Sequence, residues 1–224
     1  VILNLNGNVD IKGAEFTNNT VTHATYGLIS TFNSSVTTIG NVIFDNNTIT
    51  TGYDIYQSSG TLKLEGAAVK ANIYVASWNS INVTGQLTQG SKYNVTVPDY
   101  TAYPFDTTSI VNFTYDGVTT DEVATQKAYF VSADTNYSFV QGDTNTTKLY
   151  LEKNITLTFN VNDSVAGKVS PTTLTVPYNS TVSISDNILT INNQTVTATA
   201  TTSTDSAKYA FASWSVADGT KIKS

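Results

Sequence analysis

Carboxylates and lysines are the side chains of this chain that could do chemistry. Glycoside cleavage needs two carboxyl groups that face each other across a sugar. Five acids are spread over the first part of the chain: Asp10, Glu15, Asp45, Asp54 and Glu65. Lys63 and Glu65 stand two residues apart, which places both on one face of a strand. The sequence puts no second acid beside them, so we predict a surface ion pair and no catalytic residue.

Metal and cofactor chemistry finds little support in the sequence. The single histidine, His23, cannot form a triad alone, and the paired histidines of a zinc site are missing. In the segment Asp143-Thr144-Asn145, side-chain oxygen atoms occur at alternate positions, as they do in a calcium-binding loop. The glycine and the distal glutamate of an EF-hand are lacking. We therefore interpret Asp143 to Asn145 as a turn and expect no metal site and no cofactor.

Three aromatic residues are the remaining candidates for a binding site. The segment PDYTAYPF, residues 98–105, contains Tyr100, Tyr103 and Phe105. Its two prolines keep it out of a central strand and predict a loop or an edge that displays the rings. Exposed rings stack on sugar faces and anchor protein interfaces, so these are candidate ligand-binding residues. The alternative is that they cover the open end of a solenoid core.

The composition excludes several classes of partner. The net charge is -6, all basic residues are lysines, and cysteine is absent. Such a surface repels nucleic acids and anionic lipid headgroups, so neither is an expected partner. No run approaches roughly 18 apolar residues, and we expect no direct membrane insertion. The chain starts in mid-pattern at Val1, which predicts a fragment of a longer polypeptide.

The tripeptide Asn-X-Ser/Thr recurs throughout the chain. Candidate N-glycosylation acceptors are Asn18, Asn33, Asn46, Asn82, Asn94, Asn112, Asn136, Asn145, Asn154, Asn162, Asn179 and Asn193. Asn and Thr are so frequent that chance explains these tripeptides equally well. In either case the surface is neutral, polar and rich in hydroxyl groups, which favours an extracellular location at the cell surface.

A repeated heptapeptide indicates how the elements are arranged. FTNNTVT at residues 16–22 returns as FDNNTIT at residues 44–50, twenty-eight positions later. Short alternating runs surround both copies, among them GLIST, NVIF, TITTGYDIY and TLKLEG, and such runs predict strands. The sequence thus predicts a solenoid coil of twenty-eight residues with three short strands, in which Phe16 and Phe44 stack and the asparagines occupy a corner. A short helix is expected from Thr120, because two acids follow a capping threonine.

The FxNN motif between apolar strands resembles the repeat of right-handed parallel β-helix surface proteins, including polymorphic outer-membrane proteins and the adhesin-like proteins of methanogenic archaea. The resemblance covers roughly residues 1–154. The segment INVTGQLTQGSKYNVTVP and the runs after it also look like the end of such a β-helix.

A different pattern begins at Ile155. Hairpins follow one another, with two-residue turns at Asp186-Asn187 and Asn192-Asn193 that need positive φ. The order TLTFN, VSP, TVPYN, TVSIS and FxxW resembles the internalin-type B repeat, also called the Listeria–Bacteroides repeat. That resemblance implies a compact β-grasp-like module used along extracellular stalks, with Trp214 filling its small core.

Three hypotheses for function follow, and in the third, purely structural one the whole chain is an inert spacer. The expected fold is all-β, with the C-terminal coils and capping region of a right-handed parallel β-helix over residues 1–153 and a small β-grasp-like module over residues 154–224. The resemblance implies a cell-surface adhesin-like protein that attaches to glycans or surface proteins of another cell, and no enzyme. The alternative is a secreted carbohydrate-active enzyme or its binding module, which two carboxylates within about 10 Å in a groove would distinguish.

Overall fold

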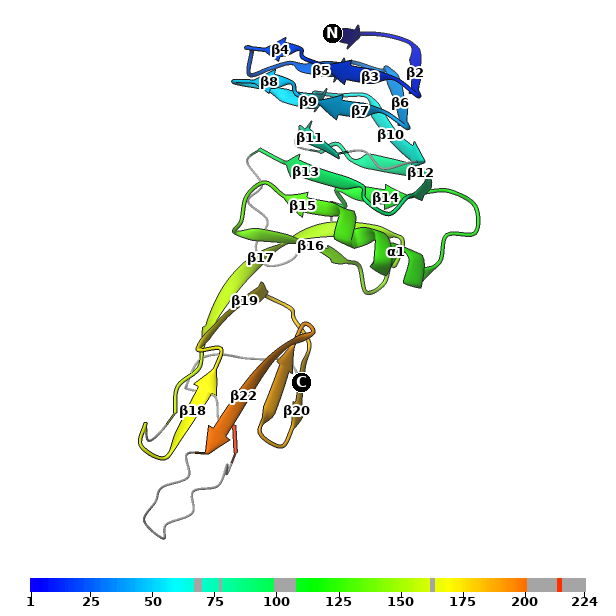
Figure 1. Ribbon diagram of the computed structural model, residues 1–224. Coiled ribbons are helices and arrows are strands. Elements are labelled where there is room, and N and C mark those ends of the chain that lie inside the picture. Colours follow the sequence, from blue (N-terminus) through cyan, green and yellow to red (C-terminus); the bar gives the residue numbers. More distant parts are fainter. Residues whose placement is uncertain (67–69, 77, 99–107, 162–163, 201–212, 215–224) are drawn as a thin grey trace. The chain divides into compact units, whose positions relative to one another are not determined.

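The computed structural model describes residues 1–66, 70–76, 78–98, 108–161, 164–200 and 213–214 (Figure 1). The all-β prediction is confirmed, since the described elements are strands apart from one short α-helix and one 3-10 turn. The chain divides into two compact units, Val1–Glu152 and Lys153–Ser224. No described helix is long and apolar enough to cross a membrane.

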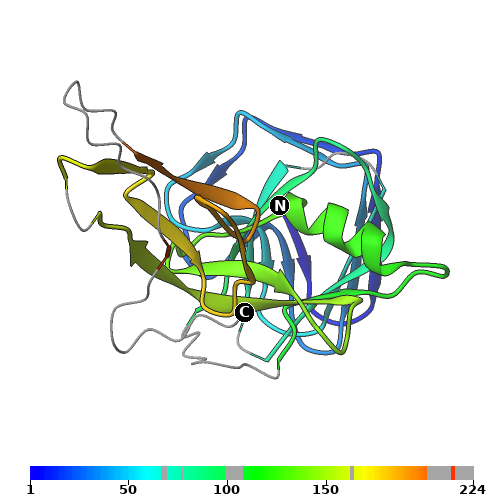
Figure 2. The ribbon, with the colours of Figure 1, turned by 90° about the horizontal axis from the view of Figure 1, so that it is seen from below.

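The first unit is a parallel β-solenoid, as predicted. The strands of its first wall are, in order, β1 (Ile2–Asn4), β5 (Gly27–Thr31), β9 (Tyr53–Gln57), β11 (Lys70–Val75), β13 (Lys92–Thr96) and β15 (Phe130–Ser132). The second wall contains β2 (Asn8–Lys12), β6 (Val36–Gly40), β10 (Thr61–Gly66), β12 (Ile81–Leu87) and β14 (Val111–Phe113). Figure 2 shows these coils around a common interior.

Stacked aliphatic side chains fill that interior. Ile29, Ile55 and Ile73 stand in register on successive coils of the first wall, and none of the three is exposed to solvent. Leu62 and Ile81 form the matching row on the second wall and are equally buried. Alternation along each short strand therefore sends one set of residues inward, and the coils bury it by stacking.

The FxNN motif forms a third side of the first two coils. Here β3 (Glu15–Thr17) pairs with β7 (Ile43–Asp45), and β4 (Thr20–Val21) pairs with β8 (Thr48–Ile49). Phe16 and Phe44 are in register with ring centroids 5.4 Å apart, which confirms the predicted stack. Asn18 and Asn46 have φ of 55° and 50°, the left-handed conformation expected of a corner.

The coil differs from the prediction in one respect. It has four strands where three were predicted, because TITTGYDIY is two strands, β8 and β9, with a corner between them. Gly52 makes this corner at φ +139°, and a Cβ there would come within 2.8 Å of two backbone oxygens. The chain therefore turns a corner within a segment that the sequence pattern predicted as one continuous strand.

The last coil of the solenoid is covered by the only α-helix among the described residues. α1 (Thr120–Gln126) is capped by Thr119, whose side chain forms a capping box with Glu122. The helix prediction is thus confirmed, with the cap one residue earlier. Val123 of α1 is fully buried in the solenoid core. A 3-10 turn, Lys127–Tyr129, follows, and β16 (Tyr137–Gln141) and β17 (Lys148–Thr158) extend the second wall, with β17 antiparallel to β14.

The second unit is an antiparallel module. A sheet of β18 (Gly167–Ser170), β22 (Gln194–Ala200), β21 (Ile188–Ile191) and β20 (Val182–Ser185) lies beside β19 (Thr173–Pro177), which pairs with the second half of β17. Both predicted two-residue turns connect hairpins, with Asp186 at φ 50° and Asn193 at φ 63°. Trp214 packs against the small core as predicted, with its ring 6.4 Å from that of Phe159.

Candidate functional site

The third coil of the solenoid is shorter than the coils before it. In the first wall Ile55 follows Ile29 by 26 residues, whereas Ile73 follows Ile55 by only 18. Only three residues, 67–69, separate the end of β10 from the start of β11, so this coil has no counterpart of β7 and β8. Among the described residues no strand pairs with the outer edges of β7 and β8, and the third side of the solenoid stops there.

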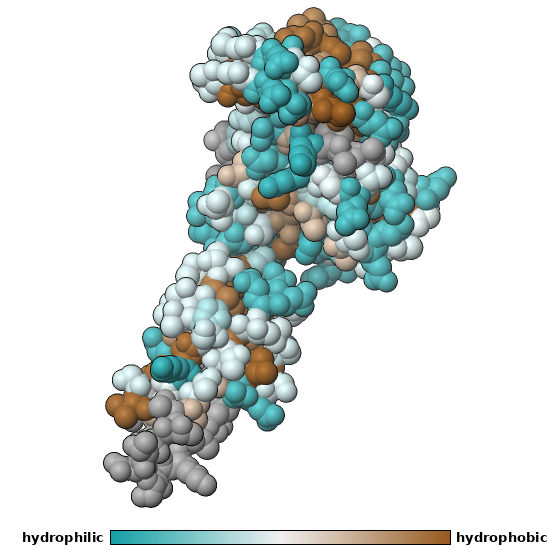
Figure 3. Space-filling model, viewed as in Figure 1, coloured by the Kyte–Doolittle hydropathy of each residue, from teal (hydrophilic) through white to brown (hydrophobic). Residues whose placement is uncertain are grey.

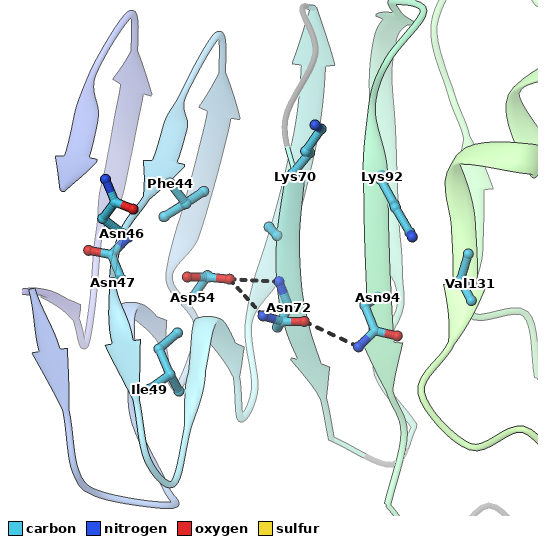
Figure 4. Close-up of a pocket in the computed structure, with 11 residues that line it drawn as sticks. Phe44, Asn46, Asn47, Ile49, Asp54, Lys70, Asn72, Lys92, Asn94 and Val131 are labelled. Atoms are coloured by element: carbon cyan, nitrogen blue, oxygen red, sulfur yellow. Dashed lines mark hydrogen bonds between the residues drawn. The ribbon is translucent and has the colours of Figure 1, made fainter. Parts of the chain in front are cut away.

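A recess of about 650 Å³ lies where the missing strands would be (Figure 4). Its apolar lining consists of Phe44, Ile49, Ala71 and Val131. Its polar lining comprises two lysines, Lys70 and Lys92, one acid, Asp54, and the amides Asn46, Asn47, Asn72 and Asn94. The volume is within the range of small-molecule sites, and this mixture of one ring, amides and charges can recognise a polar ligand with an apolar face.

Phe44 supplies the aromatic wall of the recess. One face of its ring stacks on Phe16 in the coil before, with an interplanar angle of 21°. The next coil provides no third phenylalanine, because it lacks the strand that would carry one. Phe44 remains only half-buried at the edge of the core and lines the recess. Among the described residues only Phe16 stacks on Phe44, so the position of the absent ring can receive the flat apolar face of a ligand.

A chain of hydrogen bonds fixes the polar wall. Asn72 donates to Asp54 Oδ2 through its backbone N (2.8 Å) and through its side-chain Nδ2 (3.2 Å). Asn94 Nδ2 then donates to Asn72 Oδ1 at 3.1 Å, as the dashed lines of Figure 4 show. Burial raises the pKa of the Asp54 carboxyl, an effect that the two bonds from Asn72 oppose. These hydrogen bonds fix the orientation of the Asn72 and Asn94 side-chain amides.

Lys70 and Lys92 carry the positive charge of the recess. They are in register on the neighbouring strands β11 and β13, and both are exposed. Among the described residues neither lysine has an ion-pair partner. Adjacent strands lie about 4.8 Å apart, so the two lysine side chains leave the backbone at neighbouring positions on the same face of the sheet.

The predicted ion pair of Lys63 and Glu65 is wrong. Glu65 instead binds Lys12 from two coils away, with Lys12 Nζ and Glu65 Oε1 2.6 Å apart. The Glu65 side chain reaches Lys12 across Gly40, where a Cβ would lie 3.1 Å from Glu65 Cγ. The other scattered acids, Asp10, Glu15 and Asp45, do not line the recess, so Asp54 is the one carboxylate among its described lining residues.

His23 has a local structural role. Its Nδ1 lies 2.8 Å from Thr25 Oγ1, and its ring stands 4.9 Å from that of Tyr26. Asp143 and Thr144 lie in a bend, and Asn145 O accepts a hydrogen bond from Lys148 N across the turn that follows, in agreement with the turn interpreted from the sequence. The described residues contain no group of three or more His, Cys, Asp or Glu that could hold a metal ion.

The predicted aromatic site cannot be compared with the recess. Tyr100, Tyr103 and Phe105 lie outside the described residues, as does the sequon Asn162. Among the other sequons, Asn18, Asn33, Asn46 and Asn193 are exposed at positive φ. Asn136 and Asn145 are also exposed, whereas Asn154 and Asn179 are half-buried. Asn82, Asn94 and Asn112 lie within strands, where Asn112 donates to Ser80 and Asn82.

Sequence reasoning missed the recess, although one signal for it exists. DIYQ at residues 54–57 and NIYV at residues 72–75 are also a repeat, offset by eighteen positions, and the structure places them in register. Compared with the offset of twenty-eight between the FxNN motifs, this shorter offset indicates a coil that has lost a segment.

The fold and the recess together define the class: a parallel β-solenoid with a polar recess in its side, followed by an antiparallel β module. Comparison with protein-family models, curated proteins and solved structures finds no match to this chain. Because a fold alone does not determine function, the recess is the feature from which function can be inferred.

Proposed function

We propose that this chain is part of an extracellular adhesin-like protein of the cell surface that binds glycans through the recess of its solenoid. The observation that carries the proposal is the composition of the recess. Phe44 offers a ring face, and Asn72 and Asn94 offer amides held in fixed orientations. Rings that cover a sugar face and amides that bond its hydroxyl groups are what a sugar site needs.

The remaining surface is consistent with this role. The protein is acidic, neutral amides and hydroxyl groups dominate its composition, and many sequons are exposed. The FxNN repeat resembles that of adhesin-like surface proteins, and the second unit resembles an internalin-type B repeat, a module of extracellular stalks. In this proposal the second unit is a spacer, and the partners are glycans or glycosylated surface proteins of another cell. Single contacts in so open a recess are weak, and repetition along a surface would provide avidity.

A glycan array probed with the whole 224-residue chain tests the proposal. We expect binding to a restricted set of glycans, with loss of signal in Phe44→Ala and Asn94→Ala. A matched control for Asn94→Ala is Asn82→Ala, which also changes a half-buried asparagine within a strand but lies outside the recess. An array without hits, or equal binding by the recess variants and the control, would refute the proposal.

One observation favours the alternative, a secreted carbohydrate-active enzyme. Asp54 is a buried carboxyl in a recess with a raised pKa, a property of general acids in glycosidases. Glycoside cleavage requires a second carboxyl group, and Asp54 is the single acid among the described lining residues. Release of reducing ends from polysaccharides by the wild-type chain, abolished in Asp54→Asn, would establish the enzyme and displace the adhesin proposal.

A further inference from the structure

We propose that the recess selects an acidic sugar residue, whose anionic group binds between Lys70 and Lys92 while its ring lies against Phe44. This inference rests on the proposed function and names the class of ligand for the same site. The chemistry of the anionic group is shared by a carboxylated sugar, such as a uronic acid, and by a sulfated sugar.

The two lysines form an unbalanced pair of charges. Like charges directly opposite on neighbouring strands destabilise a sheet. Lys70 and Lys92 are so placed on β11 and β13, and the described residues supply neither with a counter-ion. The chain has only eleven basic residues against seventeen acids, so two cations in register are unusual for this composition. An anionic group bound between the two lysines would attract both of them and offset their mutual repulsion.

The nearby acid, Asp54, does not cancel the positive charge of the lysines. It would repel an anion if its charge pointed freely into the recess. It is only 5% exposed, and Asn72 donates two hydrogen bonds to its Oδ2. With Lys70, Lys92 and Asp54 all ionised, the lining still has a net charge of +1, in a protein whose net charge is -6. The recess is therefore a local positive region on an acidic molecule, which favours an anion over a cation.

The arrangement of the other groups restricts the ligand to a sugar. Asn94 lies two residues after Lys92 on the same strand, and Asn72 lies two after Lys70, so each lysine is followed by an amide on the same face. A simple ion would need only the lysines. The two amides and the Phe44 ring instead match a pyranose that has hydroxyl groups at its rim, an apolar face and one acidic substituent.

The experiment compares matched pairs of oligosaccharides by titration calorimetry with the whole chain. One pair is oligogalacturonate and its methyl ester, which has the same rings without the charge. The second pair is a sulfated galactose oligomer and its unsulfated form. The variants are the double substitution Lys70→Gln with Lys92→Gln and, as control, Lys63→Gln with Lys168→Gln. The control makes the same change in net charge outside the recess. Circular dichroism verifies that both variants are folded.

The expected result is that at least one acidic oligomer binds at least about tenfold more tightly than its neutral form. The recess double variant should remove that preference, and the control double variant should retain it. Which pair shows the preference decides between a carboxylated and a sulfated sugar. Equal affinity for charged and neutral forms would overturn the inference but leave the proposed function standing. Absence of binding to any glycan would overturn both. A preference lost equally in the control would show that only the overall charge matters, and would also overturn the inference.

Discussion

Asn47 connects the first two coils and provides the sharpest test of how the FxNN motif works. Its Oδ1 accepts hydrogen bonds from the backbone N and the Nδ2 of Asn19, both at 3.0 Å, and its Nδ2 donates to Phe16 O at 2.8 Å. Asn47→Ala removes all three bonds and leaves the backbone N of Asn19 without its acceptor, whereas Phe16 O keeps its place in the ladder of β3 and β7. The bonds join neighbouring coils, so the loss acts on the stacking of the solenoid.

The magnitude follows from these contacts. A typical intramolecular hydrogen bond contributes about 0.5 to 1.5 kcal/mol net. The site is partly buried, so water replaces some of the loss, and we expect Asn47→Ala to lower the free energy of unfolding by about 2 kcal/mol. Asn19→Ala removes the Nδ2 bond to Asn47 and an exposed bond to Thr17 O, and keeps the backbone donor in place. Its expected cost is about 1 kcal/mol.

Urea unfolding followed by far-UV circular dichroism measures the two variants against the wild-type chain. At a slope of about 2 kcal/mol/M, the midpoint of Asn47→Ala should fall by about 1 M and that of Asn19→Ala by half as much. Hydrogen exchange localises the effect, with faster exchange expected in residues 15–21 and 43–49 and unchanged exchange in the second unit. If Asn47→Ala proves as stable as Asn19→Ala or more so, the Asn47 side chain does not hold the two coils together.

Three further predictions concern the core, the recess acid and a turn. Ile55→Ala should cost about 2 to 5 kcal/mol in urea unfolding, because Ile55 is fully buried between two stacked isoleucines; a smaller loss than that of Ile55→Val would contradict the packing. Burial raises the folded pKa of Asp54 above its ordinary value of 3.8, so the folded protein holds this proton more tightly and the contribution of Asp54 to stability falls as pH rises through that range. Asp54→Asn should flatten this part of the stability profile, and an unchanged profile of urea midpoints from acid to neutral pH would rule out a role for this carboxyl. Asn193 has φ 63°, so Asn193→Ala should lower the thermal stability of the second unit by about 1 kcal/mol, whereas Asn193→Gly should have little effect; equal midpoints for the two would argue against a left-handed turn.

The repeated motif made the solenoid predictable, because one pattern specifies both an inward ring and a left-handed corner. The stack of Phe16 on Phe44 and the positive φ of Asn18 and Asn46 follow from residue types and one offset. The strands β4 and β8 were not predicted as separate strands, since two residues are too few to show alternation. Gly52 was the available signal for the corner between β8 and β9, because no other residue fits that conformation and space.

Contacts between coils that do not repeat the motif were harder to predict than the stack of Phe16 on Phe44. The partner of Glu65 is Lys12, and finding it requires the register of three strands and the knowledge that Gly40 leaves a gap between them. Alternation within a strand suggested Lys63 instead, which is closer in sequence. The recess raised the same difficulty, because it arises from a segment that one coil lacks, and its residues come from several successive coils.

The short third coil explains why the recess and the buried acid occur together. The first wall keeps its stack of isoleucines through the shortened coil, so the core is continuous. The backbone pairing of β9 with β11 starts only at Ile55 and Ile73, and the Asp54 side chain accepts the hydrogen bond of Asn72 N just before it. A carboxylate thus satisfies a backbone donor where the regular ladder has not yet begun, at the cost of its own burial. The same loss that exposes Phe44 therefore also fixes Asn72 and, through it, Asn94, so that one shortened coil creates both the apolar and the polar wall of the site.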